Sequence, residues 1–213
     1  MAETSNSFTD SIAKRYDSLS QKNCCLSCGG ALSFAEIKPG DHCIDLGCGK
    51  GRDVLRMATL AGDTGRAYGV DISDGMMETA RKHAGVMGLE NIDFVKAPLE
   101  RIPLEDGIAD VIISNCTINH SMEQDKVWQE IARLLKVGGH FVVSDIYALE
   151  PVPEEYRSNP DMVAECWAGA VTREKYFEHL VQAGLKDLEL LEESEGYEKG
   201  RIRVASFTVR GRR

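Results

Sequence analysis

The stretch CIDLGCGKGRDV, at 43–54, decides the fold. Its apolar run ends in Asp45 and is followed by Gly47, Gly49 and Gly51 before a helical pattern begins. Glycines at a strand-to-helix junction remove side chains where a ligand must approach the backbone closely. Alone, the three glycines fit a tight structural turn equally well.

A second stretch favours the ligand interpretation. The run YGVDIS, at 68–73, ends a β-like segment in Asp71, where an acid accepts hydrogen bonds from both ribose hydroxyls of an adenosine. The spacing G-x-G-x-G after an acid differs from the dinucleotide pattern G-x-G-x-x-G. A pyrophosphate-binding site is a less favoured alternative, because the glycine spacing is wrong and no hydride-transfer machinery is evident.

Short β-like runs alternate with helical patterns around these stretches. The expected strands are 43–46, 67–71, 93–96, 110–114, 140–145, 187–191 and 201–209. The expected helices are 51–60, 74–86, 122–136 and 173–183, and Ser73 is the expected N-cap of the second. Such alternation implies a parallel sheet with helices on both faces. The last two strands flank a short turn, SEGYEKG, which suits an antiparallel pair. The sequence therefore predicts a Rossmann-like α/β fold whose mostly parallel seven-stranded sheet ends in a C-terminal antiparallel hairpin.

Two regions stand apart from this alternation. Residues 1–40 are expected to form a helical leader, with a helix at 11–19 and a cysteine cluster after it. The main domain is expected to span 41–213. Within it, the irregular stretch 147–171 contains three prolines and is expected to be an insertion that covers a substrate.

Composition excludes several function classes. The chain has 213 residues, 43% hydrophobic and 28% charged, with a net charge of −9. An acidic chain does not bind phosphate backbones generically, so we expect no nucleic-acid partner, and the basic C-terminus is interpreted as solvated. No secretory signal or membrane span is visible, so a cytoplasmic protein with a small-molecule substrate is expected. The sequence does not predict the oligomeric state.

The chain contains seven cysteines: Cys24, Cys25, Cys28, Cys43, Cys48, Cys116 and Cys166. Their number is odd and no export signal precedes them, so we interpret them as reduced thiols. Cys43, inside the first strand, is most simply a small buried hydrophobe. An isolated cysteine elsewhere is also more often packed than functional.

The glycine loop, together with FVKAPLERIP, VIISN and LLKVGGHFVVSD, resembles the class I S-adenosylmethionine-dependent methyltransferases over residues 40–210. This resemblance implies the class I methyltransferase fold, S-adenosyl-L-methionine as cofactor and S-adenosyl-L-homocysteine as product. The glycine loop would hold the methionine part of the cofactor, and Asp71 the ribose. Many relatives carry an acid near the adenine where this chain has Pro98. The implied cofactor-binding residues are Asp45, Gly47, Gly49, Gly51, Asp71, Ile72, Met76, Ala97, Pro98, Leu99, Asn115 and Tyr16.

Three local sequences resemble the arsenite methyltransferases more closely: ISNCTIN at 113–119, AECWAGA at 164–170 and the leader YDSLSQKNCCLSCGG. The resemblance implies that Cys116 and Cys166 bind trivalent arsenic. A third thiol would come from the leader, with Cys28 as the best match and the pair Cys24 and Cys25 as accessory. The chain departs from the family at His120, where an apolar residue is usual.

The chemistry explains why thiols suit this substrate. Arsenic(III) is soft and thiophilic, and soft ligands select soft centres. Three thiolates would leave the arsenic lone pair on the open side, so the nucleophile needs no general base. Binding would release the thiol protons, and a thiol reductant would keep the cysteines reduced.

Two alternatives stay open. One is a methyltransferase for another small molecule, with the cysteines incidental. The other, less favoured, is a zinc-binding or metal-sensing module built on the leader cysteines, for which no second pair completes four ligands.

Overall fold

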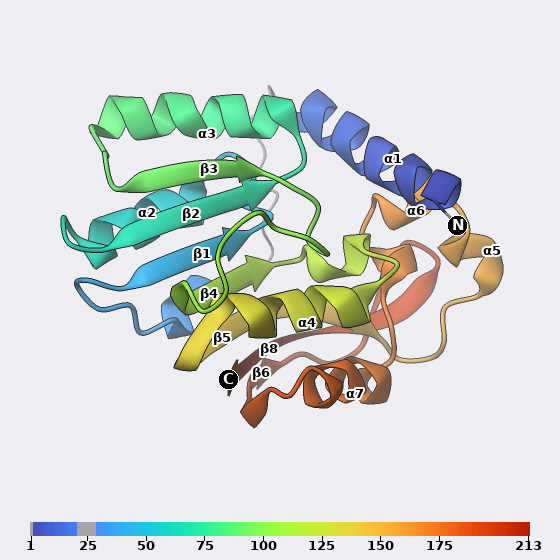
Figure 1. Cartoon of the computed structure of the whole chain (residues 1–213). Coiled ribbons are helices and arrows are strands. Elements are labelled where there is room, and N and C mark those ends of the chain that lie inside the picture. The colour runs from blue at the N-terminus through green and yellow to red at the C-terminus, as the bar shows by residue number, and fades with distance from the viewer. Residues whose placement is uncertain (1, 21–28) are drawn as a thin grey trace.

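The computed structural model describes residues 2–20 and 29–213. A twisted sheet runs through it with helices on both faces (Figure 1). Its strands are β1 (His42–Leu46), β2 (Arg66–Asp71), β3 (Ile92–Lys96), β4 (Ala109–Asn115), β5 (Leu135–Ala148), β6 (Lys186–Glu193), β7 (Tyr197–Lys199) and β8 (Ile202–Arg212). Its α-helices are α1 (Ala2–Ser20), α2 (Arg52–Ala61), α3 (Asp74–Met87), α4 (Gln124–Leu134), α5 (Glu154–Arg157), α6 (Pro160–Val163) and α7 (Arg173–Gln182). Short 3₁₀ turns are η1 (Ala31–Phe34), η2 (Ile118–His120) and η3 (Trp167–Gly169).

The strand order is β3-β2-β1-β4-β5-β8-β6. The strands from β3 to β5 are parallel, and β8 runs antiparallel to both β5 and β6. The seven predicted strands, the parallel sheet and the closing hairpin are therefore confirmed. The short strand β7, inside the predicted turn, pairs with β8 beside the main path.

Several predicted boundaries were wrong. The leader helix expected over 11–19 spans Ala2–Ser20. The helix expected over 122–136 ends at Leu134, because Leu135 already pairs with Ala109 and opens β5. The last strand continues to Arg212, because β8 pairs with β5 along its length, down to His140 opposite Arg212. Long-range pairing extends both strands beyond their local apolar patterns.

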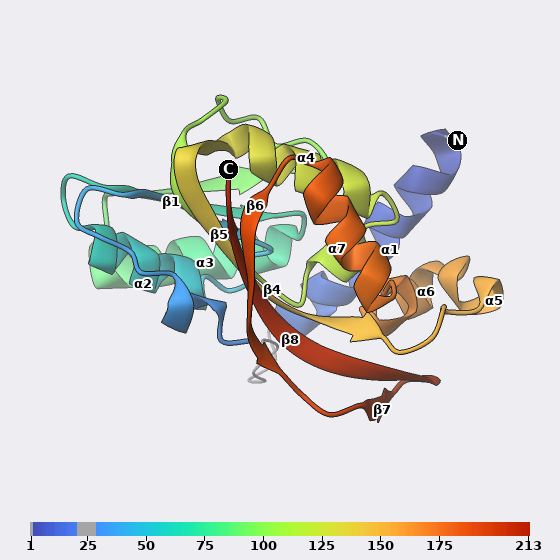
Figure 2. The same cartoon turned by 90° about the horizontal axis from the view of Figure 1, so that it is seen from below.

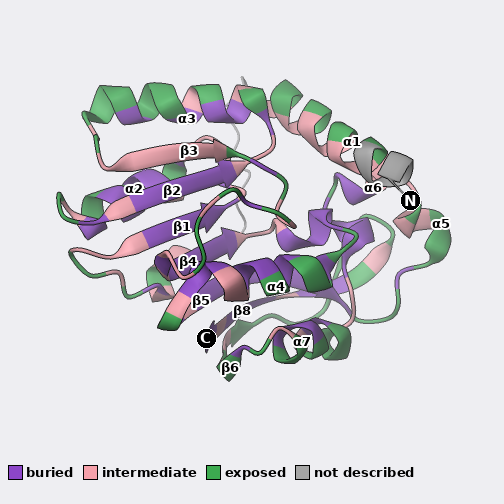
Figure 3. Cartoon of the chain, viewed as in Figure 1, coloured by how far each residue is buried: buried purple, intermediate pink, exposed green. Residues whose placement is uncertain are grey.

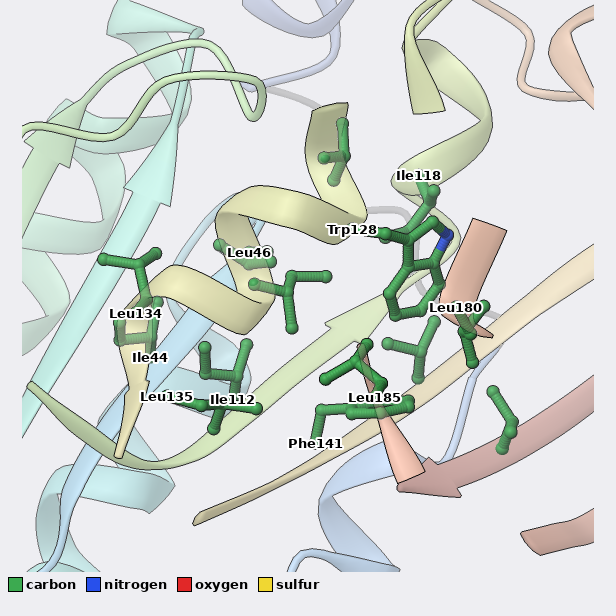
Figure 4. Close-up of a cluster of buried hydrophobic side chains, with 14 of the residues drawn as sticks. Ile44, Leu46, Ile112, Ile118, Trp128, Leu134, Leu135, Phe141, Leu180 and Leu185 are labelled. Atoms are coloured by element: carbon green, nitrogen blue, oxygen red, sulfur yellow. The ribbon is translucent and has the colours of Figure 1, made fainter. Parts of the chain in front are cut away.

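Each face of the sheet carries its own core. Helices α4 and α7 cover one face, and α2 and α3 cover the other (Figure 2). On the first face, Trp128 is fully buried, with its ring 5.3 Å from that of Phe141 and 5.4 Å from that of Tyr176 (Figure 4). On the opposite face lies Cys43, fully buried as predicted, and burial raises the pKa of its thiol to about 12. Cys43 is therefore an inert packing residue.

Helix α1 lies outside the two cores, against α3 and α6, and much of its surface is exposed (Figure 3). The segment 147–171 carries α5, α6 and η3 and packs in a separate hydrophobic cluster around Trp167. Within residues 2–20 and 29–213, none of the helices has both the length and the apolar character needed to span a bilayer.

Candidate functional site

The carboxyl ends of β1, β2 and β4 open onto a cavity of about 1100 Å³. Order along the sheet reverses between β1 and β4, the place where open α/β sheets bind ligands. Helix α1 contributes Phe8 and Ile12 to the outer wall, and α5 contributes Arg157. Ligand pockets usually measure about 300–1,000 Å³, so this cavity has room for a nucleoside-sized cofactor and a substrate.

The glycine loop forms the floor of the cavity. The N–H groups of Gly47 and Cys48 donate to the Val70 carbonyl oxygen at 2.8 and 2.9 Å, which turns the chain sharply after β1. Gly47 has φ +72°, and a Cβ at this position would collide with the Thr117 side chain. Both the backbone conformation and the packing therefore require glycine here.

Asp71 ends β2 at the edge of this cavity. Its Oδ2 accepts from the Gly49 N–H at 2.8 Å, and its Oδ1 accepts from the Ser73 N–H at 2.9 Å. Burial raises the pKa of Asp71 above its usual value, and these backbone donors partly offset that effect. The Ser73 hydroxyl accepts from the Met76 N–H and caps α3, as predicted. A carboxylate has further lone pairs, so Asp71 can also accept hydroxyl donors from a ligand.

Two more acids give this end of the cavity a negative character. Asp45 is buried, and burial together with the nearby Asp53 and Asp71 raises its pKa well above the usual value. Asn115 donates from Nδ2 to Asp53 Oδ2 at 3.0 Å, and its Oδ1 accepts from the Ala31 N–H at 3.2 Å. Carboxylates clustered at one end of a cavity favour a cationic ligand. S-adenosylmethionine carries a sulfonium and an ammonium, so these residues fit it.

The remaining predicted cofactor residues mostly line the same cavity: Tyr16, Ile72, Met76, Ala97, Pro98, Leu99 and Asn115. Gly51 is not among the residues that line the cavity. It precedes α2 with φ +87°, and a Cβ there would lie 3.0 Å from the Ala80 Cβ. Its small size therefore allows α2 and α3 to pack closely.

Two predicted thiol ligands lie side by side. Cys116 follows β4 and lines the cavity, with its N–H donating to the Ser144 carbonyl at 2.8 Å. Cys166 is 50 residues further along the chain, is 5% exposed, and its Sγ lies 3.5 Å from the Cys116 carbonyl oxygen. Their φ values are +54° and +76°. A non-glycine residue in this region carries about 1–3 kcal/mol of strain, which the surrounding structure must offset.

The three leader cysteines, Cys24, Cys25 and Cys28, lie outside the described residues. Gly29, which is bonded to Cys28, lies against Asn115 and Ser144 so closely that a Cβ there would collide with both side chains. Within residues 2–20 and 29–213, no three histidine, cysteine, aspartate or glutamate side chains gather as a metal site.

Sequence reasoning missed Asp145, a buried acid behind the thiols. Its Oδ1 accepts from Asn119 Nδ2 at 2.9 Å and from the Ile146 N–H at 2.8 Å, and the Cys166 Sγ lies 4.0 Å away. Burial raises the pKa of Asp145 to about 7. Its place in the sequence could have identified it, because Asp145 ends an apolar run in VVSD as Asp71 does in YGVD.

Helix α1 is held over the cavity by polar contacts. Asp17 Oδ1 accepts from the Ser73 hydroxyl at 2.6 Å and from the Gly75 N–H at 3.0 Å, at the N-terminus of α3. The neighbouring Tyr16 hydroxyl lies 2.9 Å from His120 Nε2. Negative charge is stabilised at a helix N-terminus, so Asp17 favours the docked position of α1.

Comparison with known proteins agrees with this geometry. The family model described as a methyltransferase domain matches residues 37–193. The arsenite methyltransferase of Halobacterium salinarum is 32% identical over 81% of this chain and 44% of its own length. That of Aquipseudomonas alcaligenes is 38% identical over 78% of this chain and 50% of its own length. The chain thus spans about half the length of these curated relatives.

A solved structure extends the comparison to three dimensions. The arsenic(III) S-adenosylmethionine methyltransferase of Chlamydomonas reinhardtii superposes with a TM-score of 0.73 and 28% identity. The match covers 97% of this chain and 73% of that one.

Proposed function

This chain belongs to the class I S-adenosylmethionine-dependent methyltransferases, and from that premise we propose that it methylates trivalent arsenic held by its own cysteine thiolates. The observation that supports this substrate most is the contact of Cys166 with Cys116, which lines the cavity that Asp71 borders. The arsenite methyltransferases among its relatives support it independently.

In this proposal the loop and its acids hold the cofactor. S-adenosylmethionine supplies an activated methyl group on a sulfonium. Asp71 accepts from the ribose hydroxyls, and the glycine loop borders the methionine part. Asp45 balances the positive charge of that part together with Asp53. The adenine lies among the remaining cavity residues of this half: Ile72, Met76, Ala97, Pro98 and Leu99.

The thiols hold the substrate. Cys116 and Cys166 bind arsenic as thiolates, and Cys28 supplies the third sulfur. Each thiol gives up its proton as its sulfur binds, because the thiolate is the ligand form. The arsenic lone pair is the nucleophile, so no side chain has to remove a proton during methyl transfer. An external thiol reductant keeps the sulfurs reduced. Arsenite enters the cavity either free or as its thiol conjugate.

Helix α1 and the segment 147–171 cover the two reactants. Phe8 and Ile12 from α1 and Arg157 from α5 close the cavity on the solvent side. Holding two reactants in a productive orientation supplies about 7–11 kcal/mol of a reaction barrier. Orientation is therefore the main contribution of this chain, because the methyl group is already activated.

A turnover assay with the purified full chain tests the proposal. Arsenite, S-adenosylmethionine and glutathione are incubated with the protein, and methylated arsenic and S-adenosylhomocysteine are measured by mass spectrometry. We expect both products in equal amounts. Normal cofactor binding without methylated arsenic would mean that the substrate is another small molecule. Stoichiometric zinc in protein purified without added metal would favour a metal-binding module instead.

A further inference from the structure

His120 is a buried imidazole that connects two distant segments. Its Nδ1 lies 3.1 Å from the Val163 carbonyl oxygen, and its Nε2 lies 2.9 Å from the Tyr16 hydroxyl. A carbonyl oxygen only accepts, so Nδ1 carries the proton and donates to Val163. Nε2 is then the acceptor, and Tyr16 donates to it. Burial lowers the pKa of His120 to about 4, which keeps this neutral tautomer at neutral pH.

The Val163 carbonyl is shared with the thiol site. It also accepts from the backbone N–H of Cys166 at 2.8 Å. That bond closes the turn in which Cys166 takes its φ of +76°. Cys166 therefore keeps its unusual backbone conformation partly because Val163, three residues earlier, is fixed in place. His120, which lies outside the segment 147–171, holds the Val163 carbonyl through its Nδ1–H.

Helix α1 reaches the same turn from the other side. Arg15 lies 3.5 Å from Glu165, whose other oxygen accepts from the Trp167 Nε1–H at 3.0 Å. Glu165 and Trp167 are the two neighbours of Cys166 in the sequence. The Arg15–Glu165 pair is nearly half exposed on both sides, so it contributes little free energy. The buried contacts of His120 are the stronger connection.

We propose that His120 is a positioning residue that holds Cys166 next to Cys116 through the Val163 carbonyl, an inference that rests on the proposed arsenic-binding function of that pair. The contact between Nε2 and the Tyr16 hydroxyl connects the imidazole ring to α1. The Nδ1–H donor fixes the orientation of the Val163 carbonyl, and the Cys166 N–H follows that carbonyl. The Cys166 thiol is thereby kept 5% exposed, against the Cys116 carbonyl.

Four substitutions, three at His120 and one at Tyr16, test the two contacts of the imidazole. His120→Asn places an N–H near the position of Nδ1 and keeps the donor to Val163, but loses the contact to Tyr16. His120→Gln reaches toward Tyr16 with its amide but loses the donor to Val163. His120→Leu loses both contacts and fills the space. Tyr16→Phe removes only the hydroxyl that donates to Nε2.

The first measurement is arsenite binding by calorimetry, with sodium arsenite and a phosphine reductant. We expect about tenfold weaker arsenite binding for His120→Leu and His120→Gln, because one buried hydrogen bond is lost. His120→Asn and Tyr16→Phe are expected to stay within about threefold of the wild type. Affinity for S-adenosylhomocysteine should stay within about twofold in the His120 variants, which checks that each variant is folded.

The second measurement does not depend on arsenic. The rate of Cys166 alkylation by iodoacetamide, followed by peptide mass spectrometry, should rise about tenfold in His120→Leu and His120→Gln but not in His120→Asn. Wild-type alkylation and arsenite affinity in all variants would overturn the proposal. If the wild type binds S-adenosylhomocysteine but not arsenite, the proposed function fails, and the alkylation rates alone decide whether His120 positions Cys166.

Discussion

The two halves of the cavity are built in different ways. The cofactor half consists of one short loop after β1 and one acid after β2, joined by backbone hydrogen bonds such as Gly49 N–H to Asp71 Oδ2. The thiol half brings together Cys116 and Cys166, which are 50 residues apart, and both have positive φ. The first half needs glycine and an acid at fixed spacing, whereas the second needs several segments to dock.

This difference shows where each half is vulnerable. In the cofactor half, a substitution acts directly on a residue that is proposed to contact the ligand. In the thiol half, geometry depends on distant supports such as His120 and Ser144, whose carbonyl accepts from the Cys116 N–H. The predictions below test whether the two halves can be damaged separately.

The largest expected effect separates the thiol half from the cofactor half. Cys116→Ser and Cys166→Ser should each lower the rate of arsenic methylation by about a hundredfold or more, because a hydroxyl is a poor ligand for a soft centre. S-adenosylmethionine affinity, measured by calorimetry, should stay within about twofold. Cys43→Ala is the matched control, because this thiol is buried in the core on the α2 face. Normal turnover by either serine variant would exclude that sulfur as a required ligand.

The converse test changes the cofactor half and leaves the thiol half intact. Asp71→Ala removes a carboxylate that accepts two backbone N–H groups and is proposed to hold the ribose, so cofactor affinity should fall by about a hundredfold. Arsenite binding should be unchanged within about twofold. Asp93→Ala, which loses only a half-exposed pair with Arg66, is the control. Equal loss of both ligands in Asp71→Ala would mean that the halves form one cooperative unit.

His120, which is proposed to support the thiol half, should make the free energy of unfolding depend on pH. The pKa of His120 is about 4 in the folded protein and about 6.5 when exposed, so the unfolded chain binds the proton more tightly. The neutral imidazole therefore makes its full contribution to the free energy of unfolding above pH 6.5. That contribution decreases by up to about 3 kcal/mol as the pH falls from 6.5 through 4. Urea unfolding of the wild type and His120→Asn at pH 7.5 and pH 4.5 measures it.

In that experiment the difference in unfolding free energy between the wild type and His120→Asn should shift in favour of the variant at pH 4.5. His83→Asn, at an exposed position on α3, is the matched control for the substitution itself. A constant gap at both pH values would mean that the imidazole is not held neutral by burial.

The smallest effect concerns the helix that covers both halves. Asp17→Ala removes the acceptor of the Ser73 and Gly75 contacts, and a charge at a helix N-terminus contributes about 0.3–1 kcal/mol. S-adenosylhomocysteine affinity should fall about twofold to fivefold. The exposed Asp10→Ala on the same helix is the control. A fall that is equal in both variants would point to loss of helix charge rather than loss of docking.

Much of the fold was predictable because its signals are local. The apolar runs around Asp45 and Asp71 gave the parallel strands, and Ser73 marked the start of α3. The limits of the strands were not predictable in the same way. Leu135 belongs to β5 because it pairs with Ala109, and that pairing partner is 26 residues away in the chain. Hydrogen bonds between distant strands are invisible to a local pattern.

The candidate site likewise depends on contacts between distant segments that a local pattern does not show. Cys116 and Cys166 were identified only through resemblance, since nothing in either local sequence says that the two meet. Asp145 and the contacts of His120 were missed, because each depends on burial and on partners from other elements.

The order of residues alone determined the parallel sheet, the glycine loop and the acid that follows the second strand, because their chemistry operates within a few peptide units. Only the folded chain decided that the turn around Cys166 rests against Cys116 and is tied through His120 to the leader helix. The physical reason is that turn and helix-start signals act between neighbours in the sequence. Burial and the sharing of one carbonyl between two donors are set by whichever segments the hydrophobic cores bring together.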